Sequence, residues 1–253
     1  MEKHLGQSPR KVMLGLLSYG SEPSLACTRS LVASVAPLME AGWKSEFVAR
    51  CGDALLPRAR CSLFGSFVRS DCDRLVMIDD DVDWEPQDLI RMISWDVDVV
   101  GGAYRRKTDE HNYPVIFPYP DKLVYGPHGL LEVSALPGGF LCMSHRAAER
   151  MVHDYSHTVY WDVATQMDSW ALWDFSVHPE GWHGEDYRFC DRWRAMGEKV
   201  WCDADMDLGH TGRVKWQGNL AEWIKGKIAE EEAAEKKPLQ QMPTEDAFFE
   251  GVS

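Results

Sequence analysis

The chain has 253 residues, enough for one large domain or two small ones with an ample core. Its net charge of −13 argues against a general binder of nucleic acids, because that binding depends on Lys and Arg side chains that neutralise phosphates. Seven cysteines without a CxxC pair, no leader-like start and no apolar stretch of about 20 residues predict a soluble cytoplasmic protein without a membrane partner.

Strands and helices are predicted to alternate through the first hundred residues. The expected strands are 12–17, 45–49, 75–78 and 97–100, and the expected helices end at residues 40, 68 and 94. This alternation is typical of an α/β fold with a mostly parallel, Rossmann-like sheet flanked by helices.

The first helix is predicted to bury one apolar face. Ser21 or Ser24 would cap its N-terminus, and Gly42 would follow its end. The apolar residues at helical spacing are Leu25, Leu31, Val35 and Leu38.

The pattern changes after residue 107. Residues 108–135 predict irregular or antiparallel hairpin structure, 138–143 a buried strand, 146–152 a helix and 153–183 an ordered functional loop or lid. Residues 184–186 precede a predicted helix with Phe189, Trp193 and Met196 on one face, and 200–202 predict a last strand. We therefore expect a flexible N-terminus (1–10), one domain (11–218) with halves 11–107 and 108–218, and a charged C-terminal helix and tail (219–253).

Three consecutive carboxylates, Asp79, Asp80 and Asp81, follow the apolar strand at 75–78. They would lie at the carboxyl end of a parallel strand, where open α/β sheets bind their ligands. Like charges this close repel unless cations or hydrogen-bond donors neutralise them, and oxygen ligands suit Mg²⁺ or Mn²⁺ that carries a substrate's phosphates. The triplet predicts a divalent cation site; the alternative is a solvated turn before the helix that Pro86 opens.

Five segments, taken in order, resemble the GT-A fold nucleotide-sugar glycosyltransferases of bacterial or bacteriophage type. These segments are 79–81 (the Asp-x-Asp motif), 99–104, 138–141, 184–190 and 203–212, and the resemblance covers roughly residues 11 to 218. It implies a GT-A sheet with a smaller antiparallel acceptor-side part. It also implies metal-dependent transfer of a sugar from a nucleoside-diphosphate sugar, with a UDP-sugar favoured, to a hydroxyl acceptor. Residues 11–107 would bind the donor, and 108–218 would contain the acceptor and catalytic groups. A phage-encoded member would act in the host cytoplasm.

The same resemblance places a Mn²⁺ or Mg²⁺ ion on Asp79, Asp81 and His210. Asp81 would be a direct ligand, whereas Asp79 would contact the metal or the ribose, and Asp80 would be a donor-site neighbour without a defined role. A neutral imidazole is an ordinary ligand for such ions, although a lone histidine is more often structural.

Glu185 and Asp186 resemble an acidic pair that begins a helix near the acceptor. If the enzyme inverts the anomeric centre, Asp186, with Glu185 as the second candidate, would be the general base for the acceptor hydroxyl. If configuration is retained, the pair would instead orient hydroxyl groups. A helix N-terminus also favours carboxylates without any catalytic role.

Further donor-binding residues follow from the resemblance: Ser18, Tyr19, Arg58, Lys107, Gly138 and Gly139. Tyr19 would stack on the base, and Arg58, with Arg60 beside it, would reach the nucleotide or remain on the surface. Gly138 and Gly139 would let a strand pass close to the sugar, or would form a plain bulge.

Two other functions fit the pattern less well. A sugar-phosphate nucleotidyltransferase usually has a basic, glycine-rich loop after the first strand, but residues 18–23 contain no lysine or arginine. A non-catalytic carbohydrate-binding protein of the same fold would not need both the acidic triplet and His210.

The sequence does not decide whether the acceptor is a saccharide, a protein or a hydroxymethylated DNA base. The candidates for a basic strip that would bind modified DNA are Arg105, Arg106, Lys107, Arg188, Arg192 and Arg194. The tryptophan-rich segment 161–182 is predicted to contact the acceptor and close over it, or to cap the core. The sugar, the nucleotide and the oligomeric state are left open by the residues.

Overall fold

The computed structural model describes residues 10–179, 181–212 and 214–235. Apart from Arg10, the predicted flexible N-terminus lies outside these residues, as does the polar tail from 236 onward. The chain divides into two compact units, Met1–Leu220 and Ala221–Ser253, and every predicted site residue belongs to the first. In the described ranges, no helix combines the length and apolar character needed to cross a bilayer.

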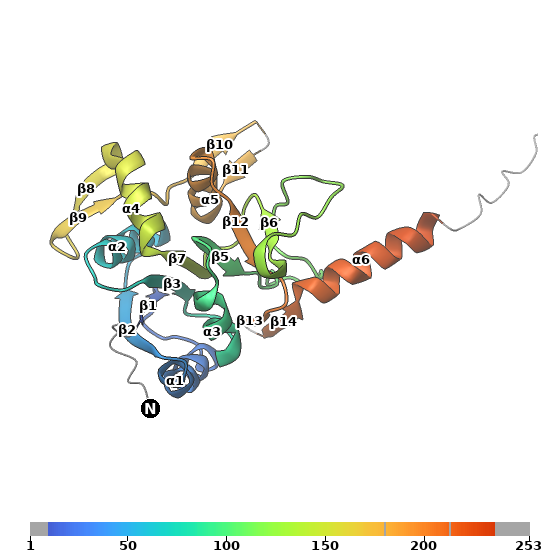
Figure 1. The fold of residues 1–253 in the computed structure, drawn as a ribbon, viewed down its shortest axis with the longest axis horizontal. Coiled ribbons are helices and arrows are strands. Elements are labelled where there is room, and N and C mark those ends of the chain that lie inside the picture. Colours follow the sequence, from blue (N-terminus) through green and yellow to red (C-terminus); the bar gives the residue numbers. More distant parts are fainter. Residues whose placement is uncertain (1–9, 180, 213, 236–253) are drawn as a thin grey trace, which may run out of the picture. The chain divides into compact units, whose positions relative to one another are not determined.

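A seven-stranded sheet forms the centre of the first unit, with the strand order β2-β1-β3-β7-β5-β12-β6 (Figure 1). The five parallel strands are β1 (Arg10–Ser18), β2 (Trp43–Cys51), β3 (Arg74–Asp79), β5 (Val99–Gly102) and β12 (Val200–Asp203). The two antiparallel strands are β6 (Leu131–Val133) and β7 (Phe140–Ser144). The predicted α/β class with a mostly parallel sheet is confirmed, and the arrangement is compatible with a Rossmann-like fold.

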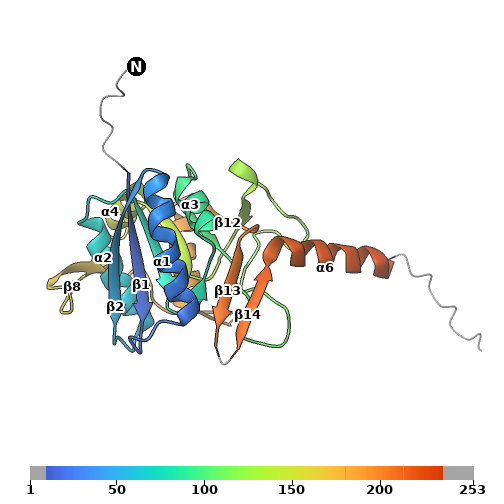
Figure 2. The same ribbon diagram turned by 90° about the horizontal axis from the view of Figure 1, so that it is seen from below.

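Five helices cover the two faces of this sheet. They are α1 (Leu25–Glu40), α2 (Leu56–Val68), α3 (Pro86–Ser94), α4 (His145–Asp154) and α5 (Glu185–Ala195). Helices α1 and α3 lie on one face, and α2, α4 and α5 lie on the other (Figure 1). Figure 2 shows α1 running along the strands β1 and β2. Burial of apolar side chains between these layers, among them Val76, Ile78, Leu89 and Cys142, forms the core.

The expected apolar face of α1 is partly wrong. Leu25 is 77% exposed and Val35 is 48% exposed, whereas Leu38 is buried as predicted. The face toward the core contains Ser30 and Ser34 instead. Their hydroxyls bond the backbone and indole N–H of Trp84, so small polar side chains satisfy groups that the core would otherwise leave unpaired.

The N-terminus of α1 is capped by Ser24, one of the two predicted caps. Its side chain accepts a hydrogen bond of 3.0 Å from the backbone N–H of Cys27. The backbone N–H of Ser24 in turn donates to the carbonyl of Asp80 at 2.8 Å, which ties the start of the helix to the acidic triplet.

A smaller antiparallel sheet lies next to the carboxyl end of β3. It contains β4 (Val82–Asp83), β13 (Asp207–Thr211) and β14 (Lys215–Asn219) in the order β14-β13-β4. In this register, His210 is opposite Val82 and Gly209 is opposite Asp83. The pairing brings the last predicted motif beside the acidic triplet.

The segment 153–183, expected to be a loop or lid, contains regular hairpins. The strands β8 (Val159–Asp162) and β9 (Met167–Trp170) form one, and β10 (Ser176–His178) and β11 (Gly181–His183) form the other. Short 3-10 helices occupy Pro127–Gly129 and Ser156–Thr158, and α6 spans Leu220–Glu235. Of the tryptophans here, Trp173 is buried and stacks on Phe189 of α5, while Trp161 and Trp182 are exposed.

Candidate functional site

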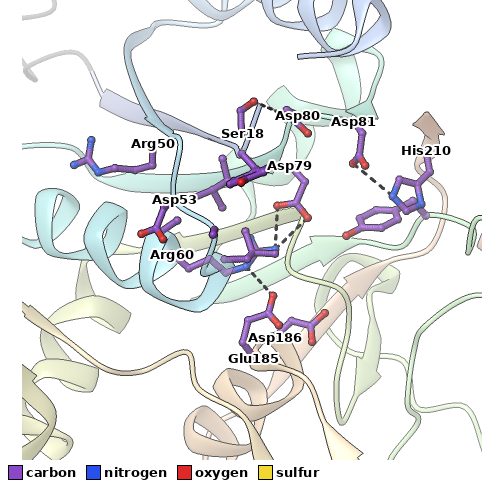
Figure 3. A pocket seen from close by; sticks show the side chains of 16 residues that line it. Ser18, Arg50, Asp53, Arg60, Asp79, Asp80, Asp81, Glu185, Asp186 and His210 are labelled. Carbon is purple, nitrogen blue, oxygen red and sulfur yellow. Dashed lines mark hydrogen bonds and ion pairs between the residues drawn. The ribbon is translucent and has the colours of Figure 1, made fainter. Parts of the chain in front are cut away.

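A cavity of about 400 Å³ opens at the carboxyl ends of β1 and β3 (Figure 3). The parallel register of these strands sets Leu17 opposite Asp79, so the residues that follow both strands meet at one edge of the sheet. The predicted residues that line the cavity are Ser18, Tyr19, Arg60, Asp79, Asp80, Asp81, Glu185, Asp186 and His210. Five segments that are far apart in the chain therefore contribute to one cavity.

Asp81 and His210 face each other across this cavity. The Nε2 atom of His210 lies 3.5 Å from Oδ1 of Asp81, and the backbone N–H of Thr211 donates to the carbonyl of Asp81 at 2.7 Å. The β4–β13 pairing fixes this approach, because it aligns His210 with the residue that follows Asp81.

The other imidazole nitrogen fixes the orientation of His210. Its Nδ1 lies 2.8 Å from the carbonyl oxygen of Arg105, so Nδ1 carries the proton in the tautomer that makes this bond. In that tautomer of the neutral ring, Nε2 carries a lone pair, whereas the protonated ring donates from Nε2 toward Asp81. A carbonyl partner on the far nitrogen is the arrangement typical of metal-binding histidines.

Lys107 supplies a second cationic partner for Asp81. Its ammonium group forms an ion pair with Oδ2 of that carboxylate. Burial raises the pKa of Asp81, but hydrogen bonds from His210 and Lys107 outweigh burial and hold the pKa below its ordinary value. Asp81 is therefore an ionised carboxylate that already attracts positive charge.

Arg60 of α2 joins the two ends of the cavity. It is 1% exposed, and its guanidinium contacts Asp79 at 2.9 Å and Glu185 at 3.3 Å and donates to the carbonyl of Gly138 at 3.1 Å. Burial lowers the pKa of Arg60, but the surrounding carboxylates raise it above its ordinary value. Arg60 is a fixed cation that neutralises the inner carboxylates.

The three aspartates of the triplet point to different partners, as Figure 3 shows. Asp79 binds Arg60, Asp80 accepts a hydrogen bond from the hydroxyl of Ser18, and Asp81 faces His210. Burial raises the pKa of Asp79, although Arg60 opposes this shift. Of the three predicted metal ligands, the structure directs Asp81 and His210 toward each other and Asp79 away from them.

A second group of side chains has potential metal-ligand atoms that lie closer together than those of Asp79, Asp81 and His210. Among the described residues, the ligand atoms of Glu46, Asp71 and Cys72 all lie within 4.8 Å of one another, and Asp79, Asp81 and His210 do not form such a set. Two of those three side chains are exposed, and Asp71 already forms an ion pair with Lys11. This cluster is on the surface and contributes no residue to the cavity.

Asp186 has the pKa of a potential general base. Burial raises its pKa from 3.8 to about 6, the neighbouring Glu185 adds to the increase, and Arg60 opposes it. The backbone N–H of Tyr187 donates to Asp186 at 2.8 Å. A carboxylate with a pKa near 6 is ionised at neutral pH and accepts a proton more readily than an exposed aspartate.

Gly138 and Gly139 permit close packing within the protein and do not line the cavity. A Cβ atom on Gly139 would lie 2.5 Å from Asp79 Oδ2 and from the hydroxyl of Tyr104. A Cβ atom on Gly138 would lie 3.2 Å from the guanidinium carbon of Arg60. The pair lets the chain before β7 pass over the Asp79–Arg60 ion pair.

Arg58 and Lys107 lie outside the lining of the cavity. Arg58 is exposed and forms a two-point ion pair with Asp53, with contacts of 2.7 and 2.8 Å. Lys107 reaches the site only through Asp81. Tyr19, in contrast, lines the cavity with a ring that is 71% exposed, so a face is open for stacking.

The lining residues that were not predicted include the polar side chains of Arg50, Asp53 and Tyr104. Arg50 follows the predicted strand 45–49, so its place at a carboxyl strand end was a usable signal. Tyr104 follows β5, and its buried hydroxyl accepts a hydrogen bond of 3.1 Å from the backbone N–H of Gly139. Asp53 lies in the turn after β2 and has no distinguishing pattern in the sequence.

Comparison with known proteins adds no family to these observations. No family model matches the chain, and no curated protein sequence is significantly similar to it.

Proposed function

We propose that this protein is a glycosyltransferase of the GT-A type that moves a sugar from a nucleoside-diphosphate sugar to a hydroxyl acceptor with the help of a divalent cation. The single observation that carries the proposal is the convergence of Asp81 and His210, 3.5 Å apart, at the carboxyl end of β3. The order of motifs and the mostly parallel sheet agree with it.

The side chains of Asp81 and His210 are suitable ligands for Mn²⁺ or Mg²⁺. An ionised carboxylate and an imidazole nitrogen oriented by a backbone carbonyl are suitable ligands, and two protein ligands leave coordination positions for diphosphate oxygens. When bound, such a cation would neutralise the charge that develops on the departing diphosphate. Asp79 would support the site through Arg60 rather than as a direct ligand.

The remaining residues would position the donor. Tyr19 would stack on the base at the outer end of the cavity, where its ring is exposed. Ser18 is buried and holds Asp80, so its role would be to fix the triplet. Arg50 also lines the cavity, but its guanidinium donates to the hydroxyls of Ser62 and Ser66 on α2.

Asp186 would act on the acceptor if the reaction inverts the anomeric centre. The acceptor oxygen would form a bond to the anomeric carbon, the bond from that carbon to the diphosphate oxygen would break with its electron pair, and the hydroxyl proton would pass to Asp186. The raised pKa of about 6 suits this task. In a retaining reaction, Glu185 and Asp186 would orient hydroxyl groups without removing this proton.

The proposal is tested by thermal denaturation of the full chain with UDP, ADP, GDP and CDP, each with Mn²⁺ and with EDTA. We expect at least one nucleotide to raise the melting temperature only when Mn²⁺ is present. Hydrolysis of the matching nucleotide sugar is then followed by release of the diphosphate. If no nucleotide stabilises the protein in either condition, the proposed donor site is wrong.

A further inference from the structure

A second cavity, of about 570 Å³, meets the first at Asp186 and His210. Tyr104, Asp186 and His210 line both cavities, so a molecule in the second cavity reaches the same carboxylate as a donor in the first. The other lining residues include Arg105, Arg106, Trp182 and Tyr187.

The charge of this second cavity differs from that of the whole protein. The chain has a net charge of −13, yet three consecutive cations, Arg105, Arg106 and Lys107, line the cavity, and Asp186 is its one carboxylate. Lys107 is already paired with Asp81. Among the described residues, neither arginine forms an ion pair with a carboxylate, so no carboxylate neutralises either guanidinium charge.

Both arginines are held in place by neighbouring groups. The carbonyl of Arg105 accepts from His210, its guanidinium lies over the ring of Trp216 at 5.3 Å, and its Nε is buried without a hydrogen-bond partner. The backbone N–H of Arg106 donates to Asn112 at 3.1 Å. Burial raises the pKa of Tyr187 to about 12, while a hydrogen bond with the Arg106 side chain opposes this shift.

Aromatic side chains also line the cavity. Trp182 of β11 is 67% exposed and packs against Phe175 with a ring distance of 5.6 Å. An exposed indole offers a flat apolar surface next to polar groups, which suits the C–H face of a sugar ring. A planar guanidinium matches the oxygens of a carboxylate or phosphate with two parallel hydrogen bonds.

We infer that the second cavity binds an acidic saccharide as the acceptor, with its carboxylate or phosphate on Arg105 and Arg106, its ring on Trp182 and its hydroxyl toward Asp186. This inference rests on the proposed glycosyl transfer and names the class of its acceptor. A nucleic-acid acceptor fits less well, because the predicted basic strip is not a continuous surface. Arg192 is buried, and both Arg188 and Arg192 pair with Asp174.

The test measures binding to the full chain without donor or metal. Glucuronate, which carries a carboxylate, and glucose 6-phosphate, which carries a phosphate, are each compared with uncharged glucose by saturation-transfer NMR or calorimetry. We expect at least one acid to bind about tenfold more tightly than glucose, a preference that Arg105→Ala and Arg106→Ala remove. Arg29→Ala, which deletes an exposed cation on α1, keeps the preference. Circular dichroism checks that the variants fold.

Two results would overturn the inference: equal binding of the acids and glucose, or an acid preference that survives both arginine substitutions. Tighter binding of a short single-stranded DNA than of either acid would overturn it as well. Binding of nucleoside diphosphates with Mn²⁺ is measured in parallel. If the wild type binds a nucleotide with Mn²⁺ but shows no preference for the acids, the acceptor class alone is rejected. If the wild type prefers the acids but binds no nucleotide, the donor site is rejected.

Discussion

His210 and Asp81 come from opposite halves of the chain, and their side chains lie 3.5 Å apart because β13 pairs with β4. Arg105 completes the arrangement by holding the far nitrogen of the imidazole. The relationship joins the last motif of the sequence to the acidic triplet and defines where a cation would be bound.

Replacement of His210 by alanine is expected to weaken Mn²⁺ binding at least about tenfold, because it removes one of the two proposed protein ligands. The affinity is measured by electron paramagnetic resonance of free Mn²⁺. His145→Ala is a matched control, since Nδ1 of His145 also contacts a backbone carbonyl, that of Cys72 at 2.9 Å, away from the cavity. Equal Mn²⁺ affinity in His210→Ala and His145→Ala would show that the imidazole is structural.

Replacement of Lys107 by methionine is expected to strengthen Mn²⁺ binding in the absence of nucleotide. The ammonium group neutralises Asp81 and so competes with a metal for the same carboxylate. Because the pair is partly exposed, its removal is worth about 1 kcal/mol, or roughly fivefold in affinity. Lys199→Met, which breaks an exposed pair with Glu132, serves as the control. Weaker Mn²⁺ binding in Lys107→Met would mean that this lysine supports the cation site.

Asp186→Asn is expected to slow sugar transfer about 100-fold or more in an inverting reaction, with little change in nucleotide binding. The wild-type kcat/KM should fall as the pH decreases through about 6, because protonation of Asp186 removes the base. The variant should lose this acid limb. A transfer rate in Asp186→Asn within a few-fold of wild type would exclude the role of base.

The same substitution has a predicted effect on stability. The pKa of Asp186 is higher in the folded protein than its ordinary value of 3.8, so its ionised form opposes folding above pH 6. The shift corresponds to about 3 kcal/mol. Asp186→Asn should therefore raise the free energy of unfolding at pH 8, and this gain should shrink as the pH falls from 6 toward 4. Urea denaturation at several pH values measures both.

Arg60→Ala is expected to destabilise the protein by about 3–5 kcal/mol, because it leaves Asp79 and Glu185 without their buried cation. Arg58→Ala, two residues away on the same helix, breaks an exposed ion pair and should cost no more than about 1 kcal/mol. Urea denaturation compares the two variants. Similar losses in both would mean that Arg60 does not neutralise a buried charge cluster.

The α/β class and the position of the acidic triplet could be predicted because local patterns determine them. The apolar run at 75–78 and the proline at 86 mark β3 and α3 within a few residues. The face of α1 could not be predicted from apolar spacing. Ser30 and Ser34 are buried there because Trp84, distant in the chain, needs hydrogen-bond partners.

The partners within the site also depend on long-range contacts. The triplet alone does not indicate that Asp79 binds Arg60 while Asp81 faces His210. Arg60 has no pattern that distinguishes it from Arg58, because which arginine faces the core depends on how α2 packs against the sheet. The role of Gly139 likewise depends on Asp79 and Tyr104, which approach it from other strands.

The most direct measurement is calorimetric titration of the nucleoside diphosphate that gives the largest thermal shift, with Mn²⁺ present, into the wild type, Asp81→Asn and Asp71→Asn. Asp71 belongs to the surface cluster with Glu46 and Cys72, so its variant distinguishes that cluster from the proposed cation site. We predict binding to the wild type and to Asp71→Asn, with the affinity of Asp81→Asn reduced at least about tenfold. Undiminished binding to Asp81→Asn, or loss of binding only in Asp71→Asn, would contradict the proposed site.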